Sequence, residues 1–116
     1  MKAILFVSHG SRSPRSRQEN FELLERIQKK SGIPLGEAAF LETDTPSIPE
    51  GIERCVSRGV REIIVLLNFL NSGRHVLEDI PALVEAAKKK HPDIVFRVTP
   101  PVGTHPAITD LFLSWI

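Results

Sequence analysis

The feature that most constrains the fold of this chain is the segment Glu62 to Leu67, which ends in five successive apolar residues. A short, continuous apolar run predicts a β-strand that is covered on both faces, as in parallel sheets flanked by helices. A second run of this kind, Ala3 to Val7, lies near the start of the chain and is followed by a glycine turn. We therefore expect two buried strands, with the later one central in a sheet.

The remaining segments alternate between helical and extended patterns. Asp79 is a candidate helix cap with Pro81 in the first turn behind it, and Gly32 and Gly59 are placed to end helices. The patterns predict strands at 37–41 and 94–98, a loop at 99–106, and helices at 18–30, 49–58, 79–90 and 107–116. This alternation predicts an α/β fold of three layers, with a four-stranded parallel sheet in the flavodoxin-like order 2-1-3-4 and right-handed crossovers.

Composition limits the classes of function. The chain has 116 residues, 41% hydrophobic and 25% charged, with a formal net charge of +1. We expect one domain, residues 1–116, and a bulk charge of this size favours binding to neither nucleic acid nor a membrane.

The single cysteine, Cys55, cannot form an internal disulfide, and the first apolar run is too short for a signal peptide or a membrane span. We therefore expect a cytoplasmic protein.

Two histidines follow the two buried strands. His9 comes directly after the first strand, and His75 ends the loop that follows the strand at 62–67. In an order 2-1-3-4 these two loops meet at the switch point of the sheet, where α/β proteins bind ligands. Neutral imidazoles suit divalent zinc, copper, iron, nickel and cobalt, so the pair predicts a metal site.

The surrounding residues suggest an open site with an acidic ligand. Glu42 follows the second predicted strand and can supply a carboxylate ligand. Two histidines and one carboxylate are too few for a closed structural zinc site, so a metal held here can be passed on. Arg12 and Arg74 each lie near one of the histidines, and guanidinium groups bind carboxylates, so we expect a polycarboxylate ligand.

Several segments together resemble the small sirohydrochlorin cobaltochelatases, class II chelatases of tetrapyrrole biosynthesis. The resemblance covers nearly the whole chain and rests on the segments His9 to Arg12, Phe40 to Glu42, Phe69 to His75, Glu78 to Pro81 and Pro101 to Pro106. One departure is Asn68, where many members of the family have proline. The resemblance implies a chelatase-like fold and insertion of a divalent metal, Co²⁺, Ni²⁺ or Fe²⁺, into sirohydrochlorin in cobalamin, siroheme or related pathways.

The resemblance also implies roles for individual residues. His9 and His75 are expected to bind the metal and to take part in proton removal, with His9 as the base and Glu42 as a further ligand. Contacts with sirohydrochlorin are expected from Ser11, Arg12, Thr45, Leu70, Asn71, Ser72, Gly73 and Arg74. The metal is a substrate, no organic cofactor is expected, and likeness to half of the longer two-lobed chelatases implies a homodimer.

Three other functions remain open at this point. A non-catalytic carrier of metal or tetrapyrrole needs the same ligands. A histidine phosphatase also begins with a strand followed by histidine and glycine, but it requires an arginine where this chain has Ser8. A flavodoxin-like nucleotide binder can use the glycine and serine turns to hold phosphate, although no dinucleotide fingerprint is present.

Overall fold

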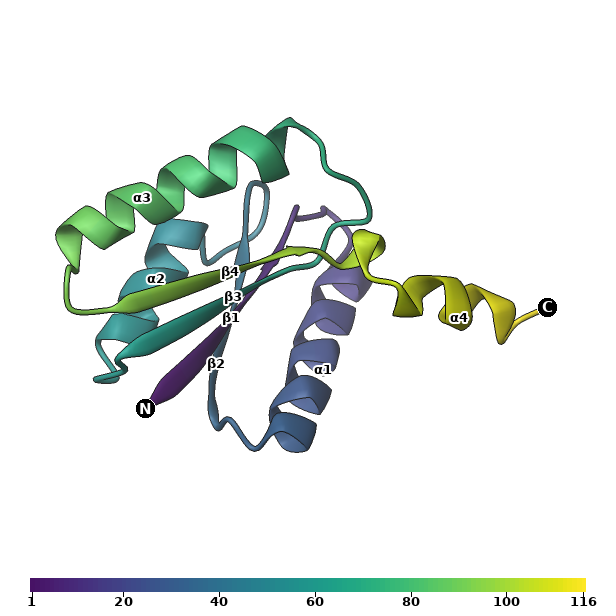
Figure 1. The fold of residues 1–116 in the computed structure, drawn as a ribbon, viewed down its shortest axis with the longest axis horizontal. Coiled ribbons are helices and arrows are strands. Elements are labelled where there is room, and N and C mark those ends of the chain that lie inside the picture. The colour runs from purple at the N-terminus through teal and green to yellow at the C-terminus, as the bar shows by residue number, and fades with distance from the viewer.

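The structure is a computed structural model that describes residues 1–116, and its centre is a parallel sheet with the strand order β2-β1-β3-β4. The strands are β1 (Lys2–Ser8), β2 (Leu35–Phe40), β3 (Glu62–Leu67) and β4 (Val95–Pro101). The predicted α/β class and the order 2-1-3-4 are confirmed (Figure 1).

Helices lie on both faces of the sheet, which explains the continuous apolar run in β1. Alternate residues of that strand enter two different clusters. Leu5 packs in the cluster that includes α2 (Ile48–Val56) and α3 (Ile80–Lys90), whereas Phe6 packs in the cluster that includes α1 (Pro14–Ser31). Both faces of β1 therefore need apolar side chains, because neither face is exposed to water.

The first two helices have the start signals that their sequences contain. α1 begins at Pro14, four residues before the predicted start, because the Ser13 hydroxyl accepts the Ser16 N–H at 3.4 Å and Pro14 fits the first turn. α2 begins after Ser47, which forms a reciprocal capping box with Glu50.

The third helix differs from the prediction at its start. A π-helical turn, His75–Asp79, runs directly into α3, and Asp79 has helical backbone angles and caps nothing. The interpretation of Asp79 as a cap is therefore wrong, because the helical chain already begins at His75. π-Turns of this kind are frequent at functional sites.

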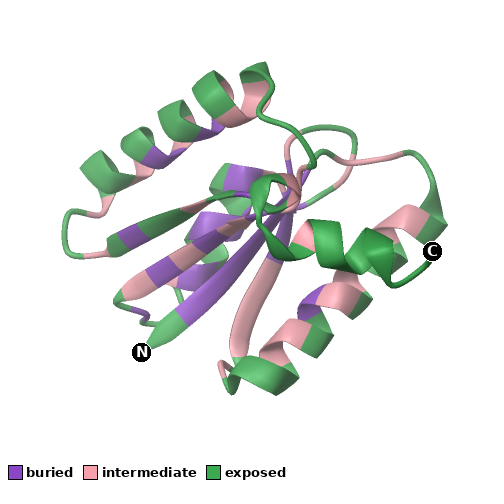
Figure 2. Ribbon diagram, turned by 45° about the vertical axis from the view of Figure 1, so that its right-hand side comes forward, coloured by how far each residue is buried: buried purple, intermediate pink, exposed green.

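The fourth strand is longer than predicted, and the last helix is set apart. β4 continues to Pro101, three residues beyond Val98, with a register shift opposite Val65 and Leu67. After a 3₁₀ turn (η2, Val102–Thr104), α4 (Ala107–Leu113) projects away from the sheet (Figure 1), and no residue of α4 is buried (Figure 2). No helix has both the length and the apolar character needed to cross a membrane.

Candidate metal centre

Three loops leave the sheet at the same edge, and the register of the strands brings them together. Ser8 pairs with Phe40 across β1 and β2, and Val7 pairs with Leu67 across β1 and β3. The loops that follow these paired positions carry Glu42, His9 and His75. The carboxyl ends of the three strands therefore present all three candidate ligands in one place, as the switch-point rule predicts.

The three predicted metal ligands converge. One ligand atom from each of His9, Glu42 and His75 lies within 4.8 Å of the others. The His9 Nε2 atom is 2.8 Å from Glu42 Oε1, and the centroids of the two imidazole rings are 5.3 Å apart. The side chains are 48%, 57% and 42% exposed for His9, Glu42 and His75. Small rotations of these exposed side chains can place all three on one ion, and the ion would keep open coordination positions.

Polar contacts orient both imidazoles. The His75 Nδ1 atom lies 2.7 Å from Asp79 Oδ2, and the His9 Nδ1 atom lies 3.3 Å from the Gly10 carbonyl oxygen. A carboxylate and a carbonyl can only accept, so the contact with Asp79 places hydrogen on Nδ1 of His75. His9 has an acceptor beside each ring nitrogen, because its Nε2 faces Glu42 Oε1 at 2.8 Å. The Nε2 atom of His75 is then free to bind metal, and the carboxylate behind the ring fixes its orientation.

Gly10 and Glu42 hold two of the loops together. The Glu42 N–H donates to the His9 carbonyl at 3.0 Å. A β-carbon on Gly10 would lie 1.8 Å from the Glu42 carbonyl oxygen, and Gly10 has a φ of +104°. Only glycine fits here, because any side chain would both strain the backbone and push the Glu42 loop away.

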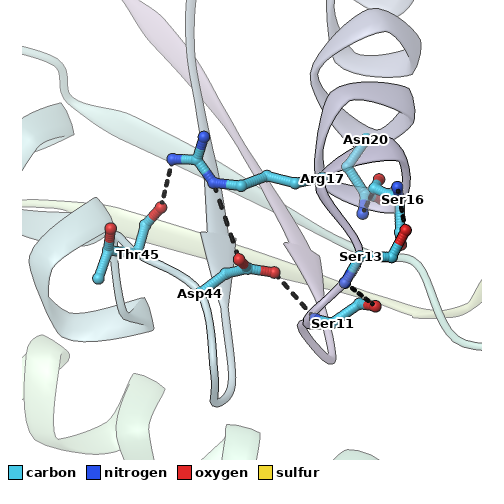
Figure 3. A network of polar contacts seen from close by, with 7 residues as sticks. All are labelled: Ser11, Ser13, Ser16, Arg17, Asn20, Asp44 and Thr45. Carbon is cyan, nitrogen blue, oxygen red and sulfur yellow. Dashed lines mark hydrogen bonds and ion pairs between the residues drawn. The ribbon is translucent and has the colours of Figure 1, made fainter.

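A second set of polar contacts ties the same loops from the side of α1 (Figure 3). The Ser11 N–H donates to Asp44 Oδ2 at 2.8 Å, Arg17 Nε is 3.8 Å from Asp44 Oδ1, and the Arg17 guanidinium donates to the Thr45 carbonyl at 3.0 Å. The Asp44 side chain is only 13% exposed. Ser11 and Thr45, predicted to contact substrate, thus have backbone groups engaged in holding the loops.

A partly buried triad lies directly beneath His9. Asn68 Nδ2 donates to Ser8 Oγ at 3.1 Å and to Asn20 Oδ1 at 3.0 Å, and Ser8 Oγ donates to Asn20 Oδ1 at 2.9 Å. These bonds join the ends of β1 and β3 to α1. Asn68, the departure from the family pattern, therefore fixes the strand ends from which the metal-binding loops leave.

The substrate-contact segment forms an exposed rim beside the histidines. Leu70 is 62% exposed, and residues 71–74 are exposed as well. Arg74 forms an exposed ion pair with Glu78 at 3.4 Å, and Arg12 is exposed on the neighbouring loop. Exposed pairs are worth at most about 1 kcal/mol, so Arg74 can exchange Glu78 for a carboxylate of a ligand at little cost.

The two other histidines lie outside the metal centre. His91 is partly buried, and its Nε2 is 2.6 Å from Glu53 Oε2. His105 Nδ1 accepts the Ala107 N–H at the start of α4. Sequence reasoning missed Asp44 and Arg17, for which no pattern stands out. It also interpreted Asp79 wrongly, as a helix cap. Asp79 follows His75 by four residues, a spacing that places two side chains side by side on a helix.

Comparison with known proteins gives a consistent result. The sequence profile described as CbiX matches residues 3–116. The chain is 35% identical over 105 residues to a sirohydrochlorin cobaltochelatase of Priestia megaterium, covering 90% of this chain and 34% of that protein. It is also 35% identical over 108 residues to the chloroplastic sirohydrochlorin ferrochelatase of Arabidopsis thaliana, covering 93% of this chain and 48% of that protein.

The fold has a close match among solved structures. The sirohydrochlorin chelatase SirB from Bacillus subtilis subspecies spizizenii, solved in complex with cobalt, superposes with a TM-score of 0.87 and 32% identity, covering 97% of this chain and 48% of that chain. The chain spans about a third to a half of the length of the curated relatives named above. The match of the profile to nearly the whole chain shows that the chain belongs to the CbiX family.

Proposed function

We propose that this chain inserts a divalent metal ion into sirohydrochlorin, with cobalt as the expected metal and nickel or ferrous iron as the other candidates. The observation that carries the proposal is the convergence of His9, Glu42 and His75 in an exposed site. Relatives that insert cobalt and relatives that insert iron both align with the chain, so their names support the reaction without selecting the metal. The product would enter cobalamin, siroheme or related tetrapyrrole biosynthesis.

The ligand set suits a metal that must be released. Imidazole and carboxylate bind divalent cobalt, nickel and iron without thiolate, and three ligands leave coordination positions for the pyrrole nitrogens. The side chains are about half exposed, so the ion can enter from solvent and leave toward the macrocycle. A closed four-ligand cage would hold the metal too well for transfer.

Metal insertion exchanges one dication for two pyrrole protons, and the same side chains can serve both movements. Each imidazole or carboxylate that releases the metal recovers a lone pair that can accept a proton. Neutral imidazole is a common general base in proteins. We assign the first proton to His9, whose Nε2 lies beside the Glu42 carboxylate at 2.8 Å. The positive charge on the protonated ring would be balanced by that carboxylate.

The rim of the site supplies groups for the acidic side chains of sirohydrochlorin. Arg12 and Arg74 are exposed on the two loops that carry the histidines, and guanidinium groups bind carboxylates in bidentate fashion. The backbone from Asn71 to Gly73 is exposed between them. We propose that Ser11, Thr45 and Leu70 complete this contact, that residues 1–116 act as one chelatase domain, and that two copies pair to form one substrate cleft.

The test is metal insertion measured against spontaneous insertion. Sirohydrochlorin is mixed anaerobically with Co²⁺, Ni²⁺ or Fe²⁺, with and without the protein, and the visible absorbance of the metallated ring is followed. We expect acceleration with cobalt at least. Tight binding of metal and tetrapyrrole without acceleration would overturn the proposal in favour of a carrier.

A further inference from the structure

The loop that carries Glu42 bends sharply just after that residue. Thr43 has a φ of +73°, in the left-handed region that a β-branched residue rarely adopts. The Asp44 N–H donates to the Glu42 carbonyl oxygen at 2.8 Å across this bend. The Glu42 side chain is 57% exposed, so core packing does not hold it. A strained backbone of this kind persists only where the surrounding structure holds it, so the loop needs a contact that keeps this shape.

The Asp44 side chain makes that contact with the loop of His9. Its Oδ2 atom accepts the Ser11 N–H at 2.8 Å, and the side chain is only 13% exposed. Ser11 follows His9 by two residues, and Asp44 follows Glu42 by two residues. This hydrogen bond therefore joins the same two loops as the 2.8 Å contact between His9 and Glu42. An intact hydrogen bond keeps the two metal ligands together.

Arg17 holds Asp44 from the side of α1. The Arg17 Nε atom lies 3.8 Å from Asp44 Oδ1, and the guanidinium donates to the Thr45 carbonyl oxygen at 3.0 Å. The guanidinium carbon lies 4.7 Å from the centre of the Phe21 ring, on the same helix. Figure 3 shows the arginine reaching from α1 to the Glu42 loop. The Asp44 carboxylate is therefore fixed by a side chain that is itself held by an aromatic ring.

We propose that Asp44 is a positioning residue for Glu42. It keeps the Glu42 loop closed against the loop of His9, so that the Glu42 carboxylate stays within reach of the metal ion. This inference deepens the proposed function and rests on its metal centre. His75, the third ligand, is oriented separately by Asp79 within the π-helical turn. Loss of Asp44 should therefore remove the carboxylate from the ion and leave the two histidines in place.

The size of the effect follows from this indirect role. Loss of a group that orients a metal ligand costs about 10- to 100-fold in metal affinity. Asp44→Ala should therefore weaken Co²⁺ binding by that factor. The loss cannot exceed the loss in Glu42→Ala, because Asp44 acts on the metal only through Glu42.

A double-mutant cycle with Co²⁺ alone tests the assignment. Calorimetry gives the Co²⁺ affinity of the wild type, Glu42→Ala, Asp44→Ala and the double variant, each expressed per folded protein. Independent effects add, whereas two residues that act through one interaction do not. We expect the double variant to bind Co²⁺ within about two-fold of Glu42→Ala. Additive losses, or an unchanged affinity in either single variant, would overturn the positioning role.

The visible spectrum of bound Co²⁺ gives a readout that a loss of stability alone does not move. This spectrum depends on the number and type of ligands on the ion. The spectrum of Asp44→Ala should therefore match that of Glu42→Ala. A wild-type spectrum in Asp44→Ala would show the carboxylate still on the ion and would overturn the proposal.

Milder variants keep the test decisive if Asp44→Ala does not fold. In Asp44→Asn the amide oxygen can still accept the Ser11 N–H, so its Co²⁺ affinity should lie between those of the wild type and Glu42→Ala. Arg17→Gln removes the guanidinium that holds Asp44 and should have an intermediate affinity as well.

Arg15→Gln is the matched control for Arg17→Gln. Arg15 is exposed on the same helix, and both variants change the net charge equally. Arg15→Gln should bind Co²⁺ within about two-fold of the wild type. Equal affinities in the two arginine variants would contradict the role of the contact between Arg17 and Asp44.

None of these measurements involves sirohydrochlorin, so the proposal and the activity can fail separately. A cycle that behaves as described, in a chain that does not accelerate insertion, would refute the chelatase activity alone. Additive losses in a chain that does accelerate insertion would refute the positioning role alone.

Discussion

Replacing Gly10 with alanine should separate the two halves of the metal centre with a single methyl group. The new β-carbon would start 1.8 Å from the Glu42 carbonyl oxygen, and real contacts of this kind are essentially never below 3.0 Å. The two loops must therefore move apart by at least 1.2 Å. The contact between His9 and Glu42, now 2.8 Å, would not survive such a shift.

The expected losses follow from that distance. A displacement of about 1 Å in a reacting group costs about 100-fold in rate. The positive φ of Gly10 adds about 1–3 kcal/mol of backbone strain, so the variant should also unfold at lower urea concentration. Co²⁺ affinity is measured by calorimetry, insertion by absorbance, and both are expressed per folded protein.

A glycine far from the loops provides the control. In Gly36→Ala the added methyl meets only the end of the Gln28 side chain, at 2.8 Å, which can move aside. Metal affinity and insertion rate should stay within about two-fold of the wild type. If Gly10→Ala kept the wild-type affinity and rate while folded, the approach of the two loops would have no part in the site.

Three further predictions concern single side chains. Asp79→Ala should weaken Co²⁺ binding by about 10- to 100-fold by releasing the His75 ring, and calorimetry showing no change would refute the orienting contact. Burial raises the pKa of Cys55 to about 11, so its thiol should react slowly with Ellman's reagent at pH 8 until denaturant is added; rapid labelling of the folded protein would contradict this. The hydrogen bond from His91 lowers the pKa of Glu53 below its ordinary 4.5, so its stabilisation is complete above pH 4.5 and is lost as pH falls through the lower folded value. As pH is lowered through this range, the urea midpoint of Glu53→Gln should therefore fall less steeply than that of the wild type. Parallel dependences on pH would count against a stabilising contact between Glu53 and His91.

The sequence predicts the sheet well because its strands carry the signal themselves. β1 and β3 are continuous apolar runs; β1 is buried on both faces, whereas β3 is buried on one face and half-buried on the other, so the expectation of full burial holds only for β1. The order of the strands and the meeting of His9 with His75 follow from topology. Glu42 joins them because its strand is the neighbour of β1.

The structure differs from the sequence-based prediction where local sequence signals conflict with tertiary context. α1 starts at Pro14 because of its cap, although the polar residues that follow show no apolar periodicity. β4 continues through Pro100 and Pro101 because an edge strand tolerates proline, whereas proline in sequence favours a loop.

The contacts that hold the site together join distant parts of the chain. Ser11 and Asp44 are 33 positions apart, and Asn68 and Ser8 are 60 positions apart. No local pattern encodes such pairs. The close approach of Gly103 to Leu70 is likewise a tertiary contact.

The most direct test of the account is the initial rate of anaerobic Co²⁺ insertion into sirohydrochlorin by four proteins. These are the wild type, His9→Ala, His75→Ala and a control, His91→Ala. His91 is a suitable control because it lies outside the metal centre and contacts Glu53. We predict at least about a 100-fold loss for each of the first two variants and a change within about two-fold for His91→Ala. A wild-type rate in His9→Ala or His75→Ala, or an equal loss in His91→Ala, would contradict the assignment of the site.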